Sequence, residues 1–460
     1  MLILKIKTYA LRWLLIFISC NTIFIAMYFA AAFIPSDTVI KQLNNAFVTG
    51  VLKTPENSVG RSTTGLGIDF GTECVALGIG LRSNPNENQV DRLWSRFNES
   101  YLPAALNSNQ FDPCAGLVEI IKPGNEQKEV DNLQSYARNW WGMSIVMQVG
   151  VLLFGLASLK SYLYALTIIS MLIFYQRFSK SMSNYTISFF LIGPFILMAD
   201  FQDLYNVAPY SIFTIQMFLF GIILLNVMRK TENQEIRIFE ISVVFGCVYN
   251  FMFWFNFHLI ITFIPIVIYL ICLGKFSQKQ TMGKIINFLI GFISGFALTT
   301  VLKWGIAIVI FGGEVSDQVI KSLSLRLSTS QNNLNGPLLD YSSAVDFLPL
   351  PLKAVYVNFL VYASKFVDPR NTSVLTIILL LLVLIFLIFL FLKKINFSII
   401  SGYRELIPAT PIFLIPFLYY MLTANHSFNH AALTYRALPL LFGLLLSLLY
   451  LAHVKDKRTV

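Results

Sequence analysis

The sequence is poor in charge and in cysteine. Asp, Glu, Lys and Arg make up only 13% of its 460 residues, whereas soluble globular proteins contain about 25%. Five cysteines are too few for a disulfide framework in a chain of this length. The sequence also has no glycine-rich phosphate loop, no zinc-finger spacing and no RNA-binding signature. These absences exclude a cytosolic enzyme, a secreted disulfide scaffold and a disordered protein.

Apolar residues dominate instead. Hydrophobic residues make up 56% of the chain, and 41 residues are Phe. Apolar runs lie near 13–34, 143–159, 161–176, 185–199, 210–228, 238–256, 258–273, 286–311, 373–392, 407–423 and 437–453. Because a transmembrane helix needs about 20 apolar residues, the sequence predicts an all-α polytopic membrane protein with about 10–11 transmembrane helices.

The distribution of basic residues predicts the topology. The net charge is +10, and basic clusters follow apolar runs at Arg177, Arg229, Lys275, Lys393 and Lys455. The positive-inside rule places these clusters in the cytoplasm. That assignment needs an even number of crossings, so it fits ten crossings and conflicts with all eleven apolar runs crossing. We therefore expect the short run 161–176, which follows Lys160, to be re-entrant or not to cross fully. Both termini are then cytoplasmic, in a bacterial cytoplasmic membrane.

Five regions follow from these runs. They are a first transmembrane helix (1–34), an outer loop subdomain (35–140), transmembrane helices with short loops (141–311), an outer loop with interfacial helices (312–372), and C-terminal transmembrane helices (373–460). The first apolar run exceeds the usual signal-peptide core of about 7–15 residues, so we expect it to be retained. Cys74 and Cys114 share the outer loop, where an oxidising compartment favours a disulfide between them.

Two acidic pairs could face the outer surface. Asp69 and Glu73 are four residues apart, so a helix would place them on one face. Either could deprotonate a sugar hydroxyl or bind a divalent ion on a phosphate. The alternative is that Asp69 caps the helix and Glu73 lies near its positive end. Asp200 and Asp203 follow an apolar run and could add acidic groups to the same region, or be solvated at a helix end.

A late polar segment, residues 423–439, could bind a phosphate. Its polar side chains include His426, Asn429, His430, Tyr435 and Arg436. Arg436 can contact a phosphate with two hydrogen bonds, and we expect His430 and Lys303 to assist it. The alternatives are a polar loop between two helices, and a Lys303 that only extends to the interface. We expect no metal site, because the two histidines have no third ligand nearby.

The whole organisation resembles the integral-membrane glycosyltransferases of the GT-C class. A cytoplasmic N-terminus, one helix, a large outer loop with an acidic motif and a late outer loop carry the resemblance. The resemblance implies a polyprenyl-phosphate-linked sugar as donor and a surface glycan or lipid as acceptor. It implies Asp69, and less directly Glu73, as base or metal ligand; a divalent cation is left open. Arg436 would correspond by role to a basic residue that holds the donor phosphate.

Two other functions stay open at this stage. An O-antigen-type polymerase or ligase would use the same donor chemistry. A lipid-linked sugar flippase would not be an enzyme and should carry charges along several helices. By the predicted topology the charges cluster on the outer face, which favours transfer over transport. Membrane lipids, the lipid-linked donor and the acceptor are the expected partners, and nucleic acid is not.

Overall fold

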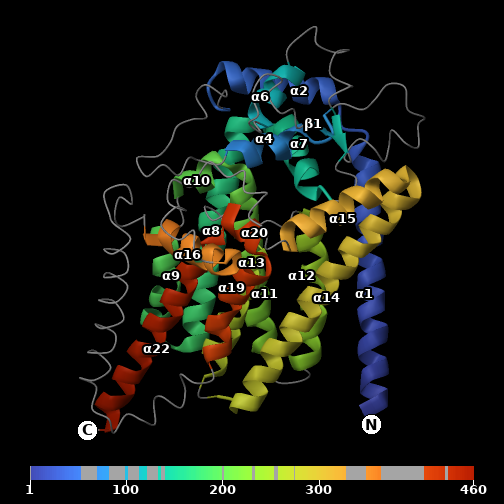
Figure 1. Ribbon diagram of the computed structural model, residues 1–460. Helices are drawn as coiled ribbons and strands as arrows, with labels where there is room; N and C mark the ends of the chain where they lie inside the picture. Colours follow the sequence, from blue (N-terminus) through green and yellow to red (C-terminus); the bar gives the residue numbers. More distant parts are fainter. Residues whose placement is uncertain are drawn as a thin grey trace.

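Figure 1 shows a computed structural model of the chain. It describes residues 2–52, 70–81, 99–101, 113–121, 133–135, 140–198, 201–229, 234–252, 257–273, 275–327, 349–363, 409–429 and 434–459. Nearly all of these residues are helical.

Four helices are long and apolar enough to cross a membrane. They are α1 (Leu2–Ala31), α8 (Leu156–Met182), α11 (Ala208–Met228) and α14 (Gln278–Phe311). At 1.5 Å per residue, even the 21 residues of α11 extend about 31 Å, close to the thickness of a bilayer core. Large side chains such as Leu15, Ile169 and Val301 remain exposed on these helices, as lipid-facing residues would. The apolar helices therefore indicate a membrane protein.

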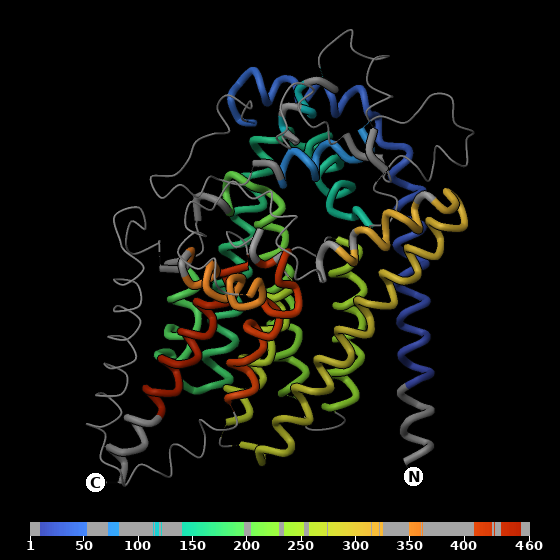
Figure 2. Tube along the Cα trace, viewed as in Figure 1, coloured from blue at the N-terminus to red at the C-terminus, as the bar shows by residue number. Residues whose placement is uncertain are grey.

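Further helices complete the bundle. They are α9 (Tyr185–Met198), α12 (Gln234–Met252), α13 (Phe257–Cys272), α19 (Thr410–Leu422) and α22 (Ala437–Thr459). Every residue of α13 from His258 to Cys272 is buried, so this helix lies inside the bundle. Both chain ends lie at the lower end of the bundle in Figure 1, opposite the segments of the first outer loop (Figure 2).

Glycines set the contact between α12 and α14. A Cβ atom at Gly246 would lie 2.2 Å from the carbonyl oxygen of Phe292, and one at Gly295 would lie 2.4 Å from that of Val243. Gly291 meets the backbone of Phe239 in the same way. Small residues that allow two backbones to approach are typical of helix packing in membranes. This contact makes α12 and α14 a tightly joined pair.

The first outer loop forms a cap over the upper end of the bundle. It contains α2 (Ser36–Val48), α4 (Phe70–Gly78) and α6 (Pro113–Ile121), with α7 (Gly142–Phe154) after it (Figure 1). Two strands of three residues, β1 (Glu99–Tyr101) and β2 (Leu133–Ser135), pair antiparallel. This small sheet is a departure from the predicted all-α structure. The predicted disulfide is present and joins Cys74 of α4 to Cys114 of α6.

The run 161–176 is not a short separate segment, although its crossing of the membrane stays a prediction. These residues belong to α8, whose 27 residues form one of the four candidate spans. The short element is α7, with 13 residues, and the chain turns after it at Gly155, where φ is 72°. Gly155 lies beside Gln42 of α2, at the level of the cap. The sequence run 143–159 therefore contains α7, a turn at Gly155 and the first residues of α8.

After α14, three helices lie toward the end of the bundle that carries the cap (Figure 1). They are α15 (Gly313–Leu327), α16 (Leu350–Ala363) and α20 (Ala424–Asn429). Val315 and Val319 of α15 pack on Ala307 of α14, while Ile320 and Leu323 are exposed. An amphipathic helix with an exposed apolar edge suits the membrane interface. Helices are therefore present in the region 312–372, as predicted, and their position at the interface stays a prediction.

Candidate functional site

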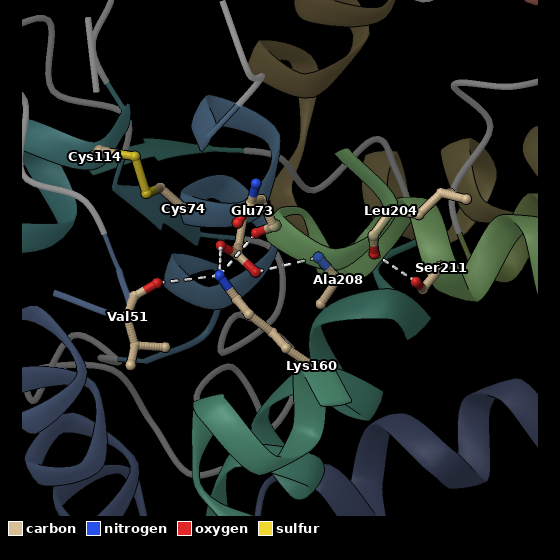
Figure 3. Close-up of polar contacts among 9 residues, drawn as sticks. Val51, Glu73, Cys74, Cys114, Lys160, Leu204, Ala208 and Ser211 are labelled. Atoms are coloured by element: carbon tan, nitrogen blue, oxygen red, sulfur yellow. Dashed lines mark hydrogen bonds and ion pairs between the residues drawn. A yellow bond between two sulfur atoms is a disulfide. The ribbon is translucent and has the colours of Figure 1, made fainter. Parts of the chain in front are cut away.

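A buried ion pair joins the cap to the bundle. The ammonium group of Lys160, in α8, lies 2.7 Å from the carboxylate of Glu73, in α4 (Figure 3). The side chains are 4% and 0% exposed. Lys160 also donates to the carbonyl oxygens of Val51 and Asn206, at 3.3 and 2.7 Å. The second oxygen of Glu73 accepts a hydrogen bond from the backbone N–H of Ala208 at 3.2 Å.

This environment favours a structural role for Glu73 over a role as base. Glu73 lies in the first turn of α4, as the capping alternative predicts. Burial raises the pKa of its carboxyl, although Lys160 and the N–H of Ala208 act in the opposite direction. Both oxygens are occupied and neither faces solvent, so an acceptor hydroxyl cannot reach them without displacing Lys160 or Ala208. Asp69, the other proposed base, directly precedes α4 and lies outside the described residues.

The first turn of α11 connects the cap to the late polar segment. Ala208 and Tyr210 both belong to this turn. Ala208 donates to Glu73, and the guanidinium group of Arg436 lies 4.4 Å from the ring centroid of Tyr210. Arg436 is buried, with 7% exposure. Two segments far apart in the sequence therefore meet the same helical turn: the acidic one of the first loop and the basic one near the C-terminus.

Hydrogen bonds hold the late polar segment, residues 423–439, against α16. The side chain of Asn358, in α16, donates to the carbonyl oxygen of Ser427 at 3.1 Å and accepts from the hydroxyl of Thr434 at 2.6 Å. The hydroxyl of Tyr420 donates to the carbonyl oxygen of Thr434 at 2.8 Å. All four residues are buried. This network holds the backbone just before Arg436 in one arrangement, and Tyr435, predicted as a supporting residue, is buried beside it.

Lys353 is a further cation in this region that the predicted site omits. It lies on α16 and is only 1% exposed. Its neighbour Ala354 belongs to the same small apolar cluster as Tyr435, the neighbour of Arg436. A helical period places Leu350, Lys353 and Val357 on this buried face. The sequence signal was a lysine within an apolar helix, which defaults to a functional interpretation in a membrane protein.

Lys303 occupies a separate aromatic setting. Its ammonium group lies 5.1 Å from the ring centroids of both Tyr28 and Trp140. The lysine is fully buried, so it does not extend to the interface. Tyr28 accepts a hydrogen bond from the backbone N–H of Trp141. Lys303 and Arg436 thus lie against different rings, Tyr28 and Trp140 for the first and Tyr210 for the second, and the predicted assistance of Lys303 to Arg436 stays a prediction.

Several predicted site residues fall outside the description. Asp200 and His430 lie outside the described residues, and of Asp203, His426 and Asn429 only the backbone is described, in α10 (Phe201–Asn206) and α20. Within the described part of the chain, no three His, Cys, Asp or Glu residues group as metal ligands would. The question of a divalent cation, left open by the sequence, therefore stays open.

Buried charge in the described residues is mainly positive. The buried cations are Lys160, Lys284, Lys303, Lys353 and Arg436. Among side chains that the structure describes, Glu73 is the one buried carboxylate. Glu73 pairs with Lys160. Cations at membrane depth mark functional sites by default, and an arginine is suited to two-point contact with a phosphate. Chemically, the region around Arg436 can stabilise an anionic group next to an aromatic surface.

Comparison of the chain with protein-family models, with curated protein sequences and with solved structures finds no match.

Proposed function

We propose that this protein is an integral-membrane glycosyltransferase. It transfers a sugar from a polyprenyl-phosphate-linked donor to a glycan or lipid acceptor at the outer face of the bacterial cytoplasmic membrane. The observation that carries the proposal is the shared first turn of α11, which contacts Glu73 at Ala208 and Arg436 at Tyr210. Asp69 precedes Glu73 by four residues in the sequence, so we infer that an acidic and a basic segment meet at one outer-face position.

Ten crossings fit the helices and the positive-inside rule. Nine of them are α1, α8, α9, α11, α12, α13, α14, α19 and α22, and the predicted span 373–392 is the tenth. The α7 helix then belongs to the cap. This even number keeps both termini on the cytoplasmic side, in agreement with their common end of the bundle (Figure 1). The cap, α16 and α20 face outward.

The proposed reaction needs one base and one cation. Asp69 takes the proton of the acceptor hydroxyl, whose oxygen forms a bond to the anomeric carbon of the sugar. The bond from that carbon to the phosphate oxygen breaks, and the phosphate leaves with the electron pair. Arg436 stabilises the negative charge that develops on the leaving phosphate. Fixed hydrogen-bond donors stabilise developing charge in the same way in acyl- and phosphoryl-transfer sites. A lipid-borne donor needs no nucleotide-binding fold.

Matched substitutions test this proposal. Asp69→Asn keeps the shape of the side chain and removes the base, and Arg436→Lys keeps the charge and removes the two-point contact. We expect each to insert normally and to lower glycan modification roughly 100-fold, measured by mass spectrometry of surface glycans from cells that carry only the variant. Lys128→Ala, in the first outer loop, should leave modification unchanged.

The results also separate the alternatives. If both variants keep near-full modification, the proposed site is wrong. If Asp69→Asn is active and Glu73→Gln is dead, Asp69 is not the base, and Glu73 is required either as the base or through its ion pair with Lys160. A flippase forms no covalent product, so release of polyprenyl phosphate from a glycosylated donor by the purified protein in detergent, where there are no two compartments, would support transfer. A polymerase or ligase would differ in its acceptor.

A further inference from the structure

We propose that Lys160 is a positioning residue for Arg436 and acts on it through the first turn of α11. The inference rests on the proposed function only where it takes Arg436 to bind a phosphate. That Lys160 fixes the position of the first turn of α11 beside Arg436 rests on the geometry alone. In the sequence, Lys160 is one lysine between two apolar runs, and it indicates only where one run ends and the next begins.

The ammonium group of Lys160 is fully committed to three elements. It contacts the carboxylate of Glu73, the carbonyl oxygen of Asn206 and the carbonyl oxygen of Val51 (Figure 3). An ammonium group has three donors, and the three contacts account for all of them. Lys160 therefore fixes the cap helix α4, the end of α2 and the end of α10 relative to α8.

The same group of contacts fixes the corner between α10 and α11. Lys160 holds the carbonyl oxygen of Asn206, and Glu73 accepts from the N–H of Ala208, the first residue of α11. This N–H is one of those that a helix leaves without an internal partner. The hydroxyl of Ser211 then donates to the carbonyl oxygen of Leu204 at 2.6 Å across the corner (Figure 3). The start of α11 is held on both sides.

Arg436 depends on that corner. Tyr210 comes two residues after Ala208, is 1% exposed, and presents its ring 4.4 Å from the guanidinium group of Arg436. A shift or rotation of the first turn of α11 would move this ring. Displacements of about 1 Å can lower the rate of a reaction about 100-fold. A buried ion pair is often no more stabilising than apolar residues of similar volume, which favours a role of Lys160 and Glu73 in geometry.

Paired removal of the two charges tests the inference. The double variant Glu73→Gln/Lys160→Met leaves no single buried charge, so we expect it to fold. Its matched control is Arg12→Met/Glu240→Gln, which removes an ion pair of the same 2.7 Å length at the surface of α1 and α12. Two measurements apply to both variants. The first is the binding of farnesyl phosphate, a short polyprenyl phosphate. The second is the rate at which a short thiol cross-linker joins cysteines placed at 210 and 436, in a protein whose Cys20, Cys247 and Cys272 are changed to Ala.

We expect the Glu73/Lys160 variant to lower the cross-linking rate and to weaken farnesyl phosphate binding about tenfold, and the control to change neither. In an Arg436→Gln background the double variant should have no further effect on binding, because it acts through Arg436. An unchanged cross-linking rate overturns the inference, and so does an additive effect on binding. If the unmodified protein does not bind the probe, the phosphate site is wrong, and the cross-linking rate alone decides whether Lys160 positions the corner.

Discussion

The ammonium group of Lys303 lies 5.1 Å from the ring centroid of Trp140, whose indole N–H donates to the carbonyl oxygen of Thr299 one turn earlier in α14. The tryptophan therefore contacts α14 twice, through its ring and through its N–H. Its ring also packs against Phe24 and Tyr28 of α1. The residue that ends the first outer loop thus ties that loop to both α1 and α14.

Trp140→Phe should destabilise the protein. The substitution keeps an aromatic ring but removes a buried hydrogen bond to the carbonyl oxygen of Thr299 at 3.1 Å, and the net contribution of such a bond to stability is about 0.5–1.5 kcal/mol. Thermal unfolding in detergent should show a lower midpoint. Trp13→Phe, which changes a half-buried tryptophan stacked on Phe17, is the control. Equal midpoints for the two variants would contradict the assigned role of the Thr299 contact.

Loss of the Cys74–Cys114 disulfide should loosen the cap. The bond closes a segment with a sequence separation of 40, and a loop of that size corresponds to about 3–4 kcal/mol in the chain-entropy account. We expect Cys74→Ser/Cys114→Ser to speed proteolysis of the first outer loop, measured on intact vesicles. Cys20→Ser, in α1, should not change the rate. Free, alkylatable thiols at both positions in protein from oxidising membranes would remove the basis of this prediction.

The start of α8 should be accessible from outside the membrane. Ser158 is exposed and lies near Lys160, which contacts the cap. We expect Ser158→Cys to react with a membrane-impermeant maleimide on intact cells, and Ser181→Cys, at the other end of α8, to react only after permeabilisation. Reporter fusions at Asn88 and Val460 should give outside and inside signals. The reverse labelling pattern would mean that 143–159 crosses the membrane after all.

Lys353 should contribute to anion binding at the Arg436 region. Lys353→Met replaces a buried cation by an apolar chain of similar length, and we expect farnesyl phosphate affinity to fall about tenfold, which is 1.4 kcal/mol. Lys321→Met changes an exposed lysine of α15 and serves as the control. The measurement is a binding titration with protein in nanodiscs. An unchanged affinity for Lys353→Met would assign the lysine to packing alone.

The sequence was sufficient for features that depend on composition and compartment. Apolar runs predicted the helices, because a spanning helix must satisfy its backbone internally and present apolar side chains. Shared location in the outer loop predicted the Cys74–Cys114 disulfide. Amphipathic patterning in the second loop predicted helices there, and the structure has a helix at Gly313–Leu327.

Features that depend on long-range contacts could not be predicted. The run 161–176 appeared short because Lys160 interrupts it, yet that lysine continues the helix once Glu73 and two carbonyl oxygens satisfy it. Glu73 appeared available as a base because its partner lies 87 positions away. Tyr210 and Lys353 gave no motif, since a site at one end of a bundle combines single residues from many helices.

The length of α14 makes the protein responsive to bilayer thickness. Its apolar run, 286–311, extends about 39 Å, beyond a hydrocarbon core of about 30 Å. The helix must therefore tilt or project, and mismatch of this kind costs fractions of a kcal/mol per ångström. Gly312 connects α14 directly to α15, which packs near α20. A thinner or thicker membrane would change the tilt of α14 and move α15 with it. The length of the lipid acyl chains would then affect the geometry of the proposed site through this one helix.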